Sequence, residues 1–248
     1  MSLEEKKVLI LGYGYVAQFY LKKNPSSLWT SRKVTENTEH SFYFDLLNKE
    51  SWKNIPNVHF VLWTFSAARN HEEVIEAVHF FDLYLKNKNV IILSTTSAYK
   101  TTNENEEVDE NSNLNFENPR VFAEEELRKK GALILHLSGI IGPERYPKIW
   151  YQKNLVKYGE NILNYVHVED IIHFVDRLFK SFKQFERFNL TSCDYKTHKQ
   201  IAEKLNGNYV FEYPNQSHQS KKIKNFKLLN YLNETSYPFK NYPEHCEI

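Results

Sequence analysis

The sequence predicts an α/β fold, a doubly wound parallel sheet followed by a small C-terminal α/β lobe. Short apolar runs alternate with helical patterns from residue 8 to residue 142, and the first run ends in a glycine-bearing turn. Strands that alternate with helices at this spacing form right-handed βαβ crossovers, so the sheet is parallel and covered on both faces. The remainder is more polar. We therefore expect a sheet domain in residues 1–142, with part of the chain after residue 160 returning to it, and a lobe in residues 143–248.

The expected strands are short, apolar and rich in branched side chains, as buried parallel strands are. We place six of them at residues 8–11, 28–30, 41–44, 58–64, 90–93 and 132–137.

Two helices of the sheet domain carry clear start signals. Asn70 and Glu73 are placed to cap a helix after the fourth strand, and Asn118 precedes Pro119 at the first helical position of another. The polar segment 103–117 is expected to be a loop.

The lobe has its own helix signals. Asp170 opens an amphipathic helix, and Thr197 with Gln200 fits a capping box.

Composition narrows the class of protein. Lys and Arg number 32 against 31 Asp and Glu, so the basic excess typical of nucleic-acid and anionic-membrane binders is missing. No apolar run approaches the roughly 18 residues of a membrane span, and the charged start does not resemble a signal peptide. The ten histidines show no metal-ligand spacing. We expect a cytoplasmic protein with reduced thiols that binds a small molecule, with no nucleic-acid or membrane partner and no metal.

The first turn predicts a phosphate site. Gly12, Gly14 and Ala17 form Gly-x-Gly-x-x-Ala between a strand and a helix. Gly12 permits the tight turn, Gly14 lets the backbone approach a pyrophosphate, and Ala17 lets the helix pack on the strand. The helix N-terminus at Tyr15 and Val16 offers backbone N–H groups and a partial positive charge. The pattern favours a dinucleotide site, and a tight turn without a ligand is the alternative.

The end of the second strand indicates which dinucleotide. An NAD site places a carboxylate about 20 residues after the first glycine, to bind the ribose 2′-hydroxyl. This chain has Ser31, Arg32 and Lys33 there, with no acid and two cations. A guanidinium can bind a 2′-phosphate through two hydrogen bonds. We therefore expect NADP rather than NAD; solvated loop charges are the alternative interpretation of the two cations.

Further matches follow along almost the whole chain: Phe44-Asp45-Leu46, Phe65-Ser66-Ala67-Ala68, the Ser/Thr-rich segment 93–99, the segment 137–143 and Asn164-Tyr165-Val166-His167-Val168-Glu169-Asp170. On these motifs the chain resembles the extended short-chain dehydrogenase/reductase family, in its NAD(P)-dependent nucleoside-diphosphate-sugar epimerase/dehydratase branch. The resemblance implies a Rossmann fold with a substrate lobe. It also implies that Asp45 and Leu46 contact adenine and that Ser66, Ala67 and Ala68 line the cofactor.

The active-site pattern of that family is not present. Its members use a Tyr-x-x-x-Lys pair on the helix after the fifth strand, and residues 101–130 contain no tyrosine. Aligning Ala123-Glu124 with the family's Ala-Glu puts Phe116 and Arg120 in the two positions. The chain therefore resembles an atypical member. The same spacing occurs elsewhere, which we attribute to chance, at Tyr84/Lys88 and Tyr195/Lys199.

Other residues are candidates for catalysis. Ser94 and Thr95 end a parallel strand, where a hydroxyl is placed to donate to a substrate oxygen; capping of the strand end is the alternative. Arg120 and Glu124 stand at i and i+4, either as an exposed ion pair or as a holder of an anionic substrate.

Three features are expected to be structural or to lie on a solvated edge. Tyr99 and His167 fit hydrogen-bonding roles, and the basic run 221–227 is expected to be a solvated edge. The family resemblance offers an alternative for that run, contact with a substrate phosphate.

The sequence and the resemblance together predict an epimerase/dehydratase-like oxidoreductase with a non-standard active site, acting on a small polar or nucleotide-sugar-like molecule. The alternative is a catalytically inert NADP-binding protein that serves as a redox sensor or scaffold. The resemblance also makes a homodimer one possible assembly.

Overall fold

The computed structural model describes residues 7–205 and 207–242, and its chain forms two compact units. Unit 1 contains the chain up to residue 94, residues 115–136 and residues 172–187. Unit 2 contains residues 95–114, residues 137–171 and the chain from residue 188. Each unit is thus assembled from several segments, and a division into domains at residue 142 stays a prediction.

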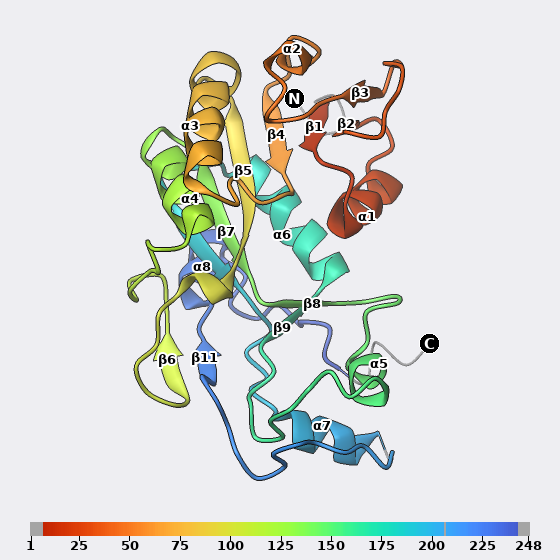
Figure 1. Cartoon of the computed structure of the whole chain (residues 1–248), viewed down its shortest axis with the longest axis vertical. Helices are drawn as coiled ribbons and strands as arrows, with labels where there is room; N and C mark the ends of the chain where they lie inside the picture. Colours follow the sequence, from red (N-terminus) through yellow and green to blue (C-terminus); the bar gives the residue numbers. More distant parts are fainter. Residues whose placement is uncertain (1–6, 206, 243–248) are drawn as a thin grey trace. The chain divides into compact units, whose positions relative to one another are not determined.

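A seven-stranded parallel sheet confirms the predicted fold class (Figure 1). Its order is β10-β7-β5-β4-β1-β2-β3. Because β1 lies between β4 and β2, the strand order reverses at β1, which is where doubly wound sheets bind ligands. The strands are β1 Val8–Leu11, β2 Leu28–Ser31, β3 Ser41–Tyr43, β4 Phe60–Trp63, β5 Asn89–Thr95, β7 Leu133–Leu137 and β10 Arg187–Leu190.

Helices cover both faces of this sheet. In unit 1, α3 (His71–Phe80) packs against α4 (Pro119–Lys129) on one face, while α1 (Tyr15–Lys23) and α6 (Val168–Lys180) lie on the other (Figure 1). An ion pair of 3.1 Å between Lys23 and Asp176 joins the second pair. The shorter helices are α2 Lys49–Trp52, α5 Pro147–Gln152, α7 His198–Lys204, α8 Phe226–Leu232, the π-helix η2 Phe81–Leu85 and the 3₁₀ turn η3 Thr96–Ala98.

The predicted helix starts are confirmed where side chains cap backbone N–H groups. Asn70 Oδ1 accepts from the Glu73 N–H, and Asn118 caps α4 before Pro119. Thr197 and Gln200 form the predicted capping box. The α6 helix begins two residues before the predicted Asp170, at Val168.

Each unit has its own apolar core. Every residue of β1 and β4 is buried, as expected for strands covered on both faces, and Trp52, Trp63 and Phe80 fill the core of unit 1. The core of unit 2 is built around Tyr151 and Tyr165.

The prediction of a loop over residues 103–117 is partly wrong. Strand β6 (Glu106–Val108) lies within it and pairs in parallel with β11 (Lys221–Ile223). Lys221 lies opposite Glu106 and Lys222 opposite Glu107, so the two segments balance each other in charge. A second short pair joins β8 (Gly139–Ile141) to β9 (Tyr165–His167). Such pairings depend on partners far away in the sequence, which a local pattern does not reveal.

Candidate functional site

The turn after β1 is fixed by threonines from both neighbouring strands. The Gly12 N–H donates to Thr30 Oγ1 at 3.0 Å, and Thr64 Oγ1 donates to the Leu11 carbonyl oxygen at 3.0 Å. Gly12 has φ of +98°, and a Cβ there would meet Thr64 Oγ1 and Phe65 Cδ1 at 3.0 Å. The turn therefore requires glycine at residue 12.

Gly14 has a different role, because it borders open space. It is the N-cap of α1 in an extended conformation, and a Cβ there would meet no described heavy atom within 4 Å. The first turn of α1 contains no acidic residue, so the partial positive charge of the helix N-terminus is not offset locally. Behind it, Val16 and Ala17 are buried and Tyr15 is half-buried. A helix N-terminus that begins beside open space suits an anionic group.

A cavity of about 370 Å³ in unit 1 lies at the carboxyl ends of β1 to β4. Eight of the predicted cofactor residues line it: Gly12, Gly14, Ser31, Arg32, Lys33, Asp45, Leu46 and Ser66. Five predicted residues are outside its lining: Tyr15, Val16, Ala17, Ala67 and Ala68. It also contains residues that the sequence interpretation did not assign to it: Tyr13, Thr30, Phe44, Leu47, Thr64, Phe65, Arg69 and Glu73.

The cavity wall after β2 is cationic. Arg32 and Lys33 are exposed, and neither forms an ion pair with any residue in the described ranges. The Lys33 N–H donates to Ser31 Oγ at 3.1 Å, which holds the backbone of this loop. Both positive charges are thus available to a ligand.

The wall after β3 is fixed by the short helix α2. The Asp45 N–H donates to Ser51 Oγ at 2.9 Å, and Trp52 Nε1 donates to the Leu46 carbonyl oxygen at 3.1 Å. One Asp45 carboxylate oxygen accepts from the Leu47 N–H at 3.1 Å. Asp45 and Leu46 therefore present a preformed edge to the cavity.

An ion pair between Arg69 and Glu73 completes the wall after β4. Arg69 Nη2 lies 2.6 Å from Glu73 Oε1, and the backbone N–H of Arg69 donates to Oε2 at 2.7 Å. The hydrogen bonds from Arg69 hold the pKa of Glu73 below its usual range. From the sequence, Glu73 was recognised only as a capping residue; its i, i+4 spacing to Arg69 was the available signal.

Two of the three predicted catalytic residues belong to one cluster. Ser94 Oγ donates to Glu124 Oε2 at 2.5 Å, and Arg120 Nε donates to Oε1 at 2.7 Å. Arg120 also donates to the Leu93 carbonyl oxygen at 3.1 Å. The Glu124 side chain is only 2% exposed, so the expectation of an exposed ion pair is wrong. Burial raises the pKa of Glu124 despite the neighbouring guanidinium.

The other predicted polar residues have structural contacts. Thr95 Oγ1 accepts from the Ser97 N–H at 3.3 Å and so caps η3. The buried Tyr99 hydroxyl donates to Asn189 Oδ1 at 2.7 Å, and His167 Nδ1 accepts from the Glu169 N–H at 3.2 Å. These contacts fit the structural interpretations of all three residues.

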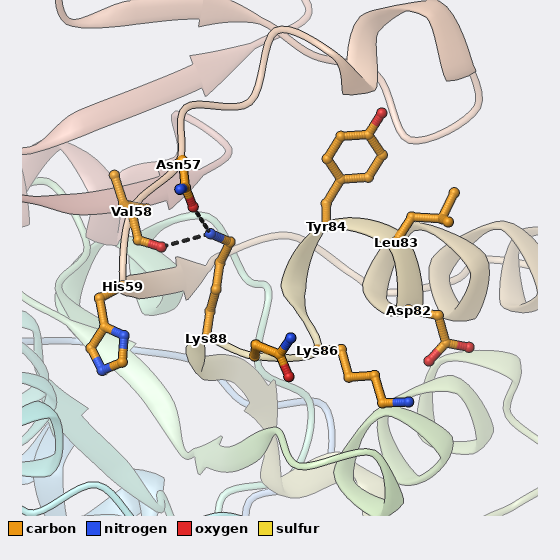
Figure 2. A pocket seen from close by; sticks show the side chains of 9 residues that line it. Asn57, Val58, His59, Asp82, Leu83, Tyr84, Lys86 and Lys88 are labelled. Carbon is orange, nitrogen blue, oxygen red and sulfur yellow. Dashed lines mark hydrogen bonds between the residues drawn. The ribbon is translucent and has the colours of Figure 1, made fainter.

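A second cavity of unit 1, of about 480 Å³, lies at the amino ends of β4 and β5 (Figure 2). Its Lys88 ammonium donates to Asn57 Oδ1 at 2.7 Å and to the Val58 carbonyl oxygen at 2.8 Å. Tyr84 points away from Lys88, so this Tyr-x-x-x-Lys spacing does not form a catalytic pair (Figure 2). Asp82, also in the lining, is paired with Lys130 at 2.8 Å.

Tyr195 and Lys199, the other Tyr-x-x-x-Lys spacing, also have other partners. The Tyr195 hydroxyl donates to the Ile223 carbonyl oxygen, and Lys199 contacts Asn215 and Glu160.

The described residues contain neither a candidate metal cluster nor a helix that could span a membrane. They contain no group of three or more His, Cys, Asp or Glu side chains placed to hold a metal ion. None of their helices has both the length and the apolar character that crossing a bilayer requires.

The sequence matches no protein-family model and no curated protein. Solved structures, however, share the fold. The dTDP-glucose 4,6-dehydratase of Bacillus anthracis, solved in complex with NAD, is 15% identical, with a TM-score of 0.70 over 97% of this chain and 93% of that chain. The Helicobacter pylori ADP-L-glycero-D-manno-heptose-6-epimerase is 15% identical, with a TM-score of 0.70 over 94% of this chain and 92% of that one.

The UDP-N-acetylglucosamine 4-epimerase of Bacillus cereus is also 15% identical, with a TM-score of 0.70 over 92% of this chain and 93% of that chain. At these identities the likeness shows the fold, which is the one that the resemblance implied. Whether the chain belongs to an atypical branch stays a prediction.

Proposed function

We propose that this chain is an NADP-binding, epimerase/dehydratase-like oxidoreductase with a non-standard active site. The observation that carries the proposal is the cavity at the carboxyl ends of β1 to β4, which combines the glycine turn with the unpaired cations Arg32 and Lys33. The neighbouring structure solved with NAD supports a pyridine dinucleotide there. The unpaired cations support NADP over NAD.

The residues present fit such a cofactor. The open space before Gly14 and the N-terminus of α1, at Tyr15 and Val16, suit the pyrophosphate. The preformed edge at Asp45 and Leu46 suits adenine, and Ser31, Arg32 and Lys33 suit the 2′-phosphate. Ser66, which lines the cavity, suits the remaining ribose, whereas Ala67 and Ala68 are buried outside the lining. When bound, the cofactor supplies hydride transfer.

Proton transfer in this proposal uses the Ser94 cluster instead of a tyrosine. Ser94 Oγ is held by Glu124, whose raised pKa brings the carboxyl group closer to neutral pH and makes it a better proton acceptor. Arg120 orients the carboxylate from the other side. The proposal requires that a substrate oxygen replace Glu124 as the hydrogen-bond partner of Ser94 Oγ.

The substrate class follows from the enzymes that share the fold, whose names specify nucleotide sugars. We propose a small polar or nucleotide-sugar-like substrate, with residues 143–248 forming most of its binding lobe. A cytoplasmic location and a homodimer are parts of the same proposal. The acidic strand beside the basic run supports the absence of a nucleic-acid partner.

Thermal unfolding with added cofactor tests the central claim. A ligand that binds only the folded state raises Tm by mass action. We expect NADPH to raise Tm more than NADH does at equal concentration. Equal shifts would refute the NADP preference, and no shift with either cofactor would refute the site.

The inert NADP-binding protein is the second candidate, and one observation favours it. Ser94, Glu124 and Arg120 satisfy one another's hydrogen bonds inside a buried cluster, as in a purely structural network. A screen of NADPH oxidation against sugar nucleotides and small carbonyl compounds separates the two candidates. Turnover that Ser94→Ala removes would establish the enzyme, whereas NADPH binding without turnover would favour the sensor or scaffold.

A further inference from the structure

The lining of the cavity includes two arginines and two carboxylates from three of its walls: Arg32, Glu73, Arg69 and Asp45. The positive charges of Arg69 and Arg32 both lower the pKa of Glu73. The negative charges of Glu73 and Asp45 both raise the pKa of Arg69. Arg69 is therefore ion-paired with Glu73, and the charges of Asp45 and Arg32 also act on this pair.

These contacts use only some of the N–H donors of the Arg69 guanidinium. Its Nε donates to Glu73 Oε1 at 2.9 Å, and its Nη2 lies 2.6 Å from the same oxygen. The Nη1 group, with two N–H donors, has no partner within the described ranges. With 64% of its side chain exposed at the cavity wall, Arg69 offers these donors to a ligand.

Glu73 is well placed to fix the orientation of that guanidinium. Its side chain is 8% exposed, and its backbone N–H donates to Asn70 Oδ1 at 2.9 Å in the first turn of α3. Its carboxylate accepts from both the backbone and the side chain of Arg69. An arginine anchored along one edge loses less side-chain entropy when its other edge binds a ligand.

We propose that Arg69 is a second arginine for the 2′-phosphate, beside Arg32, and that Glu73 is its positioning residue. This inference rests on the proposed NADP site. A 2′-phosphate presents several acceptor oxygens and close to two negative charges, more than one exposed guanidinium satisfies. Arg32 follows β2 and Arg69 follows β4, the two strands that flank β1, and both side chains line the same cavity.

Calorimetric titration with two adenosine nucleotides tests the role of Arg69. Adenosine 2′,5′-bisphosphate carries the 2′-phosphate, and 5′-AMP lacks it. We expect Arg69→Met to weaken the bisphosphate about tenfold or more, because hydrogen bonds between charged groups are lost, and to leave 5′-AMP within about twofold. Lys49→Met, which removes an exposed cation paired with Glu76 outside the cavity, should change neither. An equal loss for both nucleotides, or no loss, would refute the proposal.

Glu73→Gln tests the positioning role, because two explanations predict opposite signs. If Glu73 acts only as a nearby negative charge, its removal strengthens binding of the bisphosphate. If it positions Arg69, binding weakens, which we expect at about threefold to tenfold, since Gln cannot accept from both N–H edges. Glu76→Gln removes a carboxylate of the same helix outside the cavity and should have little effect. Tighter binding by Glu73→Gln would overturn the positioning role.

The unmodified protein separates failure of this inference from failure of the proposed function. If it binds neither nucleotide, the dinucleotide site is refuted. If it binds both nucleotides with equal affinity, the NADP preference is refuted. If it prefers the bisphosphate and Arg69→Met retains that preference, the dinucleotide site stands and only the second arginine is refuted.

Discussion

The two cavities of unit 1 lie at opposite edges of the same strands. One, of about 480 Å³, lies before β4 and β5, and the other, of about 370 Å³, lies after β1 to β4. At the amino edge, Lys88 is bonded to Asn57 and Val58, and η2 ends at Leu85. At the carboxyl edge, α1 begins and Arg32 is unpaired.

The comparison indicates that the direction of the backbone dipoles distinguishes the two edges. A helix N-terminus adds partial positive charge to a cavity, and a helix C-terminus adds partial negative charge. In a parallel sheet the helices begin at the carboxyl edge, so donors gather there. Lysines at the amino edge meet carbonyl oxygens, as Lys88 does. The cavity at the carboxyl edge is therefore the better anion site.

The largest difference in NADPH affinity should come from introducing a carboxylate at each edge of the sheet. Gly14→Asp places a favourable N-cap residue on α1 but puts a negative charge where the pyrophosphate would bind. We expect NADPH affinity to fall by about a hundredfold or more while Tm without ligand stays equal or rises. Calorimetric titration and thermal unfolding measure the two effects.

Asn57→Asp is the matched control at the amino edge. The new carboxylate meets the Lys88 ammonium, so NADPH affinity should not change. A comparable loss of affinity in both variants would contradict the assignment of the site to the carboxyl edge.

Reversing one cation at each edge should give the next largest effect. Arg32→Glu is expected to weaken NADPH by about tenfold to a hundredfold and to favour NADH, since a carboxylate can accept from the ribose 2′-hydroxyl. Lys86→Glu, in the amino-edge cavity, should leave both affinities unchanged. Cofactor titrations of the two variants would decide; unchanged selectivity in Arg32→Glu would exclude Arg32 from the site.

Removal of Lys88 should affect stability and not binding. Lys88→Met deprives Asn57 Oδ1 and the Val58 carbonyl oxygen of their donor. We expect the free energy of unfolding to fall by about 1–2 kcal/mol, with NADPH affinity unchanged. Urea denaturation with parallel titration measures both, and a loss of affinity would show that the edges are coupled.

The smallest expected effect is a difference in acid sensitivity. Arg69 lowers the pKa of Glu73 below its ordinary value of 4.5, so near that pH the folded protein binds fewer protons than the unfolded chain. The resulting stability is complete above pH 4.5 and is lost as pH falls through the lower, folded pKa. The stability difference between the unmodified protein and Glu73→Gln should therefore shrink over this range in urea denaturation. A difference that stays constant would contradict the lowered pKa.

Local patterns were sufficient to predict the glycine turn and six of the seven strands of the sheet, but not β10. Apolar runs such as Val8–Leu11 are buried strands, and Asn118 with Pro119 begins α4. The arginine after β2 lies in the cavity because its position relative to Gly12 is set by one βαβ unit. These features depend on residues close in sequence, or on a connection of fixed geometry.

Features that depend on tertiary contacts were not predicted. The i, i+4 spacing predicts an exposed ion pair between Arg120 and Glu124. In the structure Glu124 is buried and bonded to Ser94, which is 30 residues away in the sequence. Arg69 joined the cavity because the loops after β2 and β4 meet beside β1. No spacing rule in one sequence encodes which loops of a sheet become neighbours.

The pairing of β6 with β11 has a consequence for handling the protein. Lys221 and Lys222 lie opposite Glu106 and Glu107 in the ladder, and Lys224 forms an ion pair of 2.8 Å with Glu107. A polyanion approaching this lysine segment therefore also meets the carboxylates of Glu106 and Glu107 within one Debye length at ordinary ionic strength. Heparin resin should fail to retain the chain, and cation exchange should elute it at low salt.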